Sequence, residues 1–126
     1  MEMKYYEDVK AVHQTIIGLA PEDAWTYGGI GWNYYMMGEF EMAIENGRKA
    51  VDMDTEDAML RYNLALFNLA KGNTKQAFEI YREATELDSD LRVIEDAIKD
   101  IVKAQERWPT MVQLQEGLDF LNEVKA

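Results

Sequence analysis

The sequence repeats itself at an interval of 34 residues, and this period constrains the possible folds more than any other feature. Ala24 recurs as Ala58, and Gly38 recurs as Gly72. The other identical pairs in the two copies are Ala43 and Ala77, Glu45 and Glu79, Arg48 and Arg82, Ala50 and Ala84, and Asp54 and Asp88. An interval of this size is typical of repeat proteins, in which each copy is one supersecondary unit that buries its apolar face against the next.

Apolar residues recur three and four positions apart in almost every segment, which is the spacing of one face of an α-helix. No sustained alternation of apolar and polar residues indicates a strand. We therefore expect an all-α protein, with helices at 3–18, 24–37, 40–53, 58–71, 74–87, 91–106 and 110–124. Connections of two to four residues make consecutive helices antiparallel hairpins. Gly38 and Gly72 fit C-terminal caps, and Thr110 with Gln113 forms a capping-box pattern after Pro109.

The composition excludes several classes of function. The chain has 126 residues, 48% of them hydrophobic, so one domain with a buried core is the natural expectation. A net charge of -11 disfavours nucleic acid and acidic membranes, since both ligands need clustered Lys and Arg. The absence of cysteine removes thiolate chemistry, and no apolar run is long enough to span a membrane. We expect a soluble, cytoplasmic protein.

The 34-residue unit resembles the tetratricopeptide repeat (TPR) family. The residues that carry the resemblance are Tyr27, Ile30, Gly31, Tyr34, Gly38, Phe40, Ala43 and Ala50 in the first copy, and Leu64, Ala65, Gly72, Ala77 and Ala84 in the second. The resemblance implies an αα-superhelix, with a half repeat or N-terminal helix at 1–23, repeats at 24–57 and 58–91, and a divergent repeat or cap at 92–126. In the third frame Lys99, Met111 and Leu118 stand where the family has small residues, so either the register slips to place Ala97 there or the last pair is a cap.

The stretch "YGGIGWNYYMMG", residues 27–38, holds four glycines and raises the possibility of a phosphate-binding loop. Such a loop lies between a strand and a helix, whereas Gly28, Gly29 and Gly31 lie within an expected helix. Gly31 has a packing explanation, because its position faces the second helix near Ala43. For Gly28 we hypothesise a notch between Trp25 and Trp32 that accepts another segment. The alternative is that the N-terminal helix or another copy of the chain fills the groove.

In the resembling family, the first helices of successive units line a concave groove. Carried over to this chain, the groove positions are Trp25, Gly28, Trp32, Tyr35, Met36, Met59, Tyr62, Leu66 and Leu69, with Asn63 donating to a bound backbone. The face implied is apolar and aromatic. The family's carboxylate clamp needs Lys, Arg and Asn, but the matching positions here are Gly28, Trp32, Asn63, Val93 and Ala97, of which only Asn63 fits. With Asp96 and Asp100 nearby, a basic or neutral segment with apolar anchors is favoured over an acidic tail.

We therefore expect a non-enzymatic interaction module that binds a protein or peptide partner, with no cofactor and no metal. Self-association as a homo-oligomer, or a role as a structural spacer, is the alternative. Few side chains could form a nucleophile–base pair, since His13 is the only histidine and Ser89 the only serine. "DMDTED", residues 52–57, resembles the start of a calcium loop but lacks its Gly and its bidentate Glu.

Overall fold

The computed structural model describes residues 23–126, and this region contains α-helices and no strand. The helices are α2 (Ala24–Met36), α3 (Phe40–Met53), α4 (Ala58–Lys71), α5 (Thr74–Leu87), α6 (Leu91–Arg107) and α7 (Gln113–Lys125). The all-α fold of the TPR type expected from the sequence is thereby confirmed. Within residues 23–126 no helix is long and apolar enough to cross a bilayer. The helix expected at 3–18, the half repeat that contains it and His13 lie outside the described residues.

The helix ends have local causes in the sequence. Gly38 and Gly72 adopt φ values of 81° and 101°, a left-handed conformation that glycine adopts without strain, and so they end α2 and α4 as expected. The Asp57 carboxylate accepts a hydrogen bond from the backbone N–H of Leu60 and so caps α4. The expected capping box of Thr110 and Gln113 is wrong: α7 begins at Gln113 without a side-chain cap. The Gln113 amide instead donates to the carbonyl of Ala70, because α7 packs beside α4.

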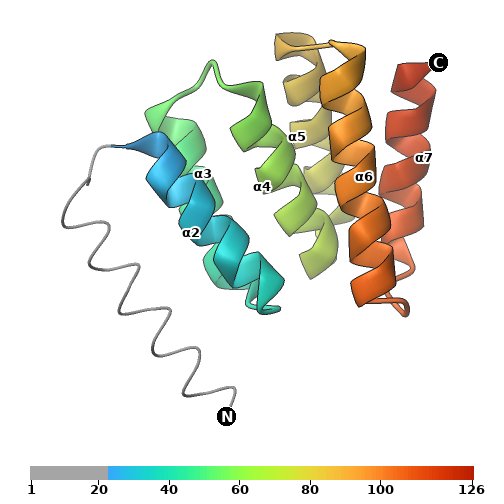
Figure 1. Ribbon diagram of the computed structural model, residues 1–126, viewed down its shortest axis with the longest axis horizontal. Helices are drawn as coiled ribbons and strands as arrows, with labels where there is room; N and C mark the ends of the chain where they lie inside the picture. Colours follow the sequence, from blue (N-terminus) through green and yellow to red (C-terminus); the bar gives the residue numbers. More distant parts are fainter. Residues whose placement is uncertain (1–22) are drawn as a thin grey trace.

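Successive helices pair as antiparallel hairpins, as Figure 1 shows. α2 packs on α3, α4 packs on α5, and α3 joins the two hairpins by packing on α4. α2, α4 and α6 are neighbours in turn and run in the same direction, with α3 and α5 behind them (Figure 1). The side formed by the first helix of each hairpin is called the α2–α4–α6 face below.

Close approach of α2 and α3 depends on Gly31. A Cβ atom at Gly31 would lie 3.1 Å from the carbonyl oxygen of Ala43, 3.1 Å from the ring of Phe67 and 3.2 Å from the backbone nitrogen of Gly47. Ala43 and Ala50 are themselves fully buried. The packing role expected for Gly31 is thus confirmed, and the same gap admits the Phe67 ring from α4.

The third hairpin departs from the arrangement of the first two. α5 packs against α7, whereas the first hairpin meets the next through α4. The ring of Phe120 in α7 stacks on Phe78 of α5 at 5.3 Å, and Gly117 lies against the side chain of Leu69. In α6 Ala97 is buried and Lys99 exposed, which is the arrangement that a register slip, one of the two alternatives, requires. The last hairpin is therefore turned relative to the others.

Two glycines in α2 provide a matched test of this packing. Gly29 is exposed, and a Cβ there would meet no atom within 4 Å, so Gly29→Ala should stabilise the fold by about 0.5–1 kcal/mol through helix propensity. Gly31→Ala should destabilise it by roughly 1–2 kcal/mol, because two of the three crowded atoms belong to the α3 backbone. Urea unfolding followed by circular dichroism measures both. Equal stabilisation by the two substitutions would contradict the packing role of Gly31.

Candidate functional site

Ten positions of the α2–α4–α6 face are expected to line a groove, and the structure leaves five of them at least partly exposed. Trp25 and Met36 are 53% and 41% exposed. Trp32, Met59 and Asn63 are half-buried. The other five, which are buried, are Gly28, Tyr35, Tyr62, Leu66 and Leu69.

Gly28 does not open a notch for another segment, which corrects the hypothesis drawn from the sequence. A Cβ atom at Gly28 would lie 2.7 Å from Cδ2 of Leu60, a residue of α4 that is itself buried. Leu60 therefore occupies the space that the missing side chain leaves. The glycine serves the packing of α2 on α4, as Gly31 serves the packing of α2 on α3.

Tyr62 and Leu66 also belong to the core and cannot contact a partner laid on this face. The Tyr62 hydroxyl donates to the carbonyl of Asp88 at 3.2 Å, at the end of α5, and its ring lies 6.2 Å from that of Tyr81. Burial, followed by the charge of Asp88, raises the pKa of Tyr62 to about 12. Leu66 is 2% exposed and is likewise part of the core. Leu69, also assigned to the groove, is fully buried beside Gly117.

One part of the face is closed by an aromatic cluster of five side chains: Trp32, Tyr35, Phe40, Phe67 and Trp108. The Tyr35 ring lies 5.0 Å from Trp32, 5.3 Å from Phe67, 6.0 Å from Phe40 and 5.2 Å from Trp108. Trp108 meets Tyr35 and Phe40 edge-on, a favourable geometry for aromatic rings. Tyr35 is thus packed by the chain's own side chains, which is why it is only 2% exposed.

Trp108 is the residue of this face that sequence reasoning missed. It directly follows α6, outside the repeat pattern, and the 34-residue period assigns it no role. The neighbouring Arg107 donates a hydrogen bond to the carbonyl of Met36, and its guanidinium lies 5.1 Å from the Trp108 ring. These contacts tie the end of α6 to the end of α2. The only local feature of the sequence that could have indicated this contact is a large aromatic residue just before Pro109.

The electrostatics of the face centre on Asp100 of α6. Burial, partly offset by Lys103 and reinforced by Asp96, raises the pKa of the Asp100 carboxyl to about 6. Burial and the nearby Asp100 charge also raise the pKa of Tyr35. Tyr81 of α5 shows the same shift, with burial first and then the influence of Tyr35 and Asp100. Both tyrosines therefore stay neutral at physiological pH.

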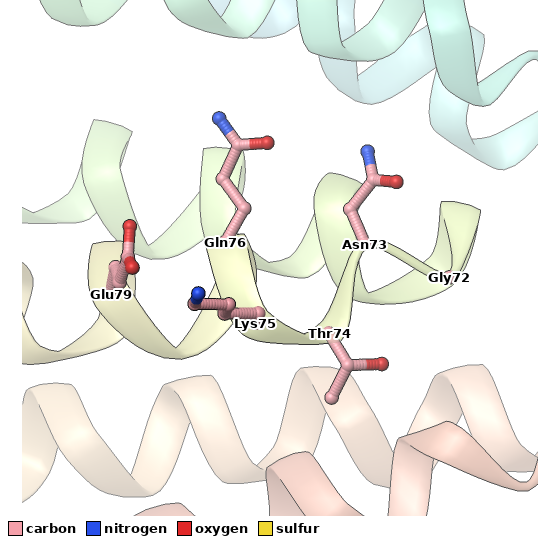
Figure 2. Close-up of a pocket in the computed structure, with 6 residues that line it drawn as sticks. All are labelled: Gly72, Asn73, Thr74, Lys75, Gln76 and Glu79. Carbon is pink, nitrogen blue, oxygen red and sulfur yellow. The ribbon is translucent and has the colours of Figure 1, made fainter.

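A shallow depression lies elsewhere, at the turn between α4 and α5. Its lining residues are Gly72, Asn73, Thr74, Lys75, Gln76 and Glu79 (Figure 2). The side chains of Asn73 and Gln76 extend to one side and that of Thr74 to the other, so they do not converge on a common point (Figure 2). In the part of the chain that the structure describes, no group of three or more His, Cys, Asp or Glu side chains could hold a metal ion.

Comparison with known proteins agrees with this architecture. Residues 60–91 match the family model of the tetratricopeptide repeat, which confirms the resemblance seen in the sequence. Over 86 residues the chain is 41% identical to a clustered mitochondria protein homolog of Coccidioides immitis and 40% identical to one of Aspergillus niger. Each alignment covers 61% of this chain and 7% of the relative, so the likeness concerns a small part of a much longer protein.

Trp108→Ala should destabilise the fold by about 2–3 kcal/mol, because it removes a half-buried ring that packs on both Tyr35 and Phe40. The matched control is Trp25→Ala, which truncates a mostly exposed tryptophan and should change the free energy of unfolding by less than about 0.5 kcal/mol. Chemical denaturation measures both variants. An equal loss for the two tryptophans would show that Trp108 does not anchor α6.

Asp100→Asn should make the protein more stable at pH 7.5, by about 1 kcal/mol after allowance for partial exposure. The folded-state pKa of Asp100 is raised, so the protonated form is favoured on folding. Its stabilisation is complete below pH 4 and is lost as the pH rises through about 6. The variant should therefore unfold at the same urea concentration as the parent at pH 4 and at a higher one at pH 7.5. A difference independent of pH would contradict the burial of this carboxyl.

Proposed function

We propose that this chain of tetratricopeptide repeats holds another polypeptide on its α2–α4–α6 face, through apolar anchors carried by an extended or helical segment. The observation that best supports this proposal is the exposure of Trp25, a tryptophan that is more than half exposed on a folded helix. Helical repeats of this type serve as interaction modules, and no catalytic role is proposed. The cytoplasmic location expected from the sequence stays a prediction.

The proposed contact surface begins with a stripe along α2, consisting of Trp25, Gly29, Trp32 and Met36. Their spacing of four, three and four residues places them on one side of the helix. α2 carries no charged side chain, and its exposed residues are Trp25, Gly29, Asn33 and Met36, so apolar and aromatic groups make up most of its solvent-facing side. Exposed apolar surface of this kind is typical of protein-binding sites, and tryptophan is enriched among residues that dominate binding energy.

The next helices add polar groups beside this stripe. Met59 and Asn63 of α4 are half-buried, so each presents part of its side chain to a bound segment. The Asn63 amide has both a donor and an acceptor, which suits the backbone of an extended peptide. α6 contributes Val93, which is half-buried, and Asp96, which is exposed. An apolar side and an acidic side therefore border the same surface.

This charge distribution argues against an acidic ligand. Asp96 and Asp100 lie on α6, and the whole chain has a net charge of -11. An acidic tail would be repelled by these carboxylates. Of the residues that form the family's carboxylate clamp, only Asn63 would be present to bind it. Apolar anchors flanked by neutral or basic residues fit the surface better.

Self-association is the alternative function, since the exposed stripe on α2 could equally be covered by a second copy of the chain. The two proposals differ in what happens to the stripe without a partner. In a peptide-binding module the stripe stays open in the free protein. In a self-associating module or spacer it is buried as the protein concentration rises.

Trp25→Ala should weaken capture of synthetic peptides with paired apolar anchors by about ten-fold or more, because a central aromatic anchor typically contributes over 1 kcal/mol. A peptide array probed with the purified parent and variant, followed by titration calorimetry on the best peptides, measures the loss.

Val112→Ala is the matched control, since Val112 is 82% exposed and precedes α7, away from α2. Equal capture by parent and Trp25→Ala would remove the assignment of this face. Light scattering over a concentration series separates the alternative: a mass that rises in the parent and stays monomeric in Trp25→Ala favours self-association.

A further inference from the structure

The α2–α4–α6 face has two chemically different ends, because its three helices run in the same direction (Figure 1). Each helix begins with an aspartate cap, Asp23 for α2, Asp57 for α4 and Asp90 for α6, whose carboxylate accepts a hydrogen bond from a backbone N–H of the first turn. Arg92 pairs with Asp90 at 3.3 Å, and the other two caps belong to no ion pair of residues 23–126. The three caps gather at the end of the face where Trp25 lies, which is called the Trp25 end below.

The opposite end of the face carries cations. Lys71 lies in the last turn of α4 and Arg107 in the last turn of α6. Arg107 donates a hydrogen bond to the carbonyl of Met36, the last residue of α2, so α2 and α6 meet where both helices end. Lys71 is paired at 3.0 Å with Glu41 of α3, whereas Arg107 has no carboxylate partner among the described ion pairs. This region is called the Met36 end below.

α6 continues the same order of charges along its length. Four charged residues follow one another at intervals of four, three and four positions: Asp96, Asp100, Lys103 and Arg107. This spacing places them on one side of the helix. Because Arg107 contacts α2, that side of α6 is the one directed toward α2. The side facing α2 is therefore acidic first and basic last.

The acidic part of α6 lies nearly level with Trp25. Asp96 precedes Arg107 by the same number of residues as Trp25 precedes Met36, which is about 16 Å of helix in both cases. The two helices run in the same direction and meet where Arg107 contacts Met36. A segment laid along α2 therefore has Asp96 beside it at the Trp25 end and Arg107 beside it at the Met36 end.

Helix capping explains only part of this order of charges. An acidic cap and a cation in the last turn are usual, because they offset the helix dipole within the first and last turns. Asp96 and Lys103 lie outside those turns of α6, so the dipole does not account for them. Both side chains are exposed, and no ion pair of residues 23–126 includes either of them. Their charges are available to a ligand.

We propose that this order of charges fixes the orientation of the bound polypeptide. The segment places a basic side chain beside Asp96 at the Trp25 end and an acidic side chain beside Lys103 and Arg107 at the Met36 end. This inference rests on the proposed function, since it names the chemistry at the two ends of the same partner. The opposite orientation would set like charges against each other at both ends, which is unfavourable at an interface.

The expected preference between the two orientations is modest, because the charged side chains are exposed. Exposed ion pairs are screened by salt and each contributes little, so we expect the favoured orientation to exceed the other by about ten-fold at low salt. High salt should reduce this preference, whereas the apolar contact with Trp25 should persist.

The tryptophans of the chain can report the orientation by NMR. Trp25 lies at one end of the face, and Trp108, which directly follows Arg107, lies at the other. The probe is a synthetic amphipathic peptide with neutral blocked termini, leucine anchors along one side, two lysines at one end and two glutamates at the other. A nitroxide spin label is attached to either end of the peptide, and the protein has no cysteine that could exchange with it. We expect the label at the lysine end to broaden mainly the indole N–H signal of Trp25, and the label at the glutamate end mainly that of Trp108.

A charge-swapped variant tests whether α6 sets the orientation. Asp96→Lys combined with Lys103→Glu exchanges two exposed charges and keeps the net charge of the chain. We expect the preference to be lost, so that each label broadens both tryptophan signals. The matched control is Glu45→Lys combined with Arg48→Glu, which exchanges two exposed charges on α3, behind the face, and should leave the parent pattern unchanged. Circular dichroism checks that both variants are folded.

The outcomes separate this inference from the proposed function. A peptide that binds the parent but not Trp25→Ala, and that shows no preferred orientation or the opposite one, would overturn the inference and leave the binding face intact. The same holds if the parent pattern survives in the charge-swapped variant, or is lost equally in the control. If the peptide does not bind, or binds equally to the parent and Trp25→Ala, the proposed function and this inference both fall.

Discussion

The rest of the structure depends on close contact between helices, which is possible because glycines at the crossing points carry no side chain. Gly31 brings α2 against the backbone of α3, and Gly47 leaves the space that the Phe67 ring enters. Phe67 then supports Trp32 and Tyr35 from below, at 6.1 Å and 5.3 Å between ring centroids. A larger side chain at either glycine would move α2 outward and remove the support of the aromatic cluster. The shape of the α2–α4–α6 face is therefore set by the backbone packing behind it.

The orientation of the third hairpin decides how much of that face stays open. The first hairpin packs directly against the second through contacts between α3 and α4. In the third unit α7 packs against both α4 and α5. The end of α6 reaches α2, where Trp108 and Arg107 contact Tyr35 and the carbonyl of Met36. One end of the face is sealed, and Trp25 at the start of α2 remains exposed.

The exposed part of the face carries its apolar and its polar groups on different helices. The stripe on α2 offers apolar area, whose burial is favourable but carries little directional information. Asn63 of α4 and Asp96 of α6 offer polar groups on two neighbouring helices, and such groups discriminate between ligands because a mismatch leaves them unpaired.

The sequence by itself determined the helices, their period and the role of Gly31, because hairpins of this kind depend on contacts between residues close in the chain. Helix bounds from 24 to 107 could be predicted to within a residue or so, while the start of α7 could not. The tertiary structure alone decided that Leu60 fills the space at Gly28, that Tyr35, Tyr62 and Leu66 are buried, and that Trp108 closes one end of the face. Tyr35 and Trp108 are far apart in the sequence, and they meet through the turn of the third hairpin, which no repeated pattern encodes. The local spacing of residues specifies each helix and its pairing with the next one. The exposure of a side chain depends instead on the final positions of all the other helices.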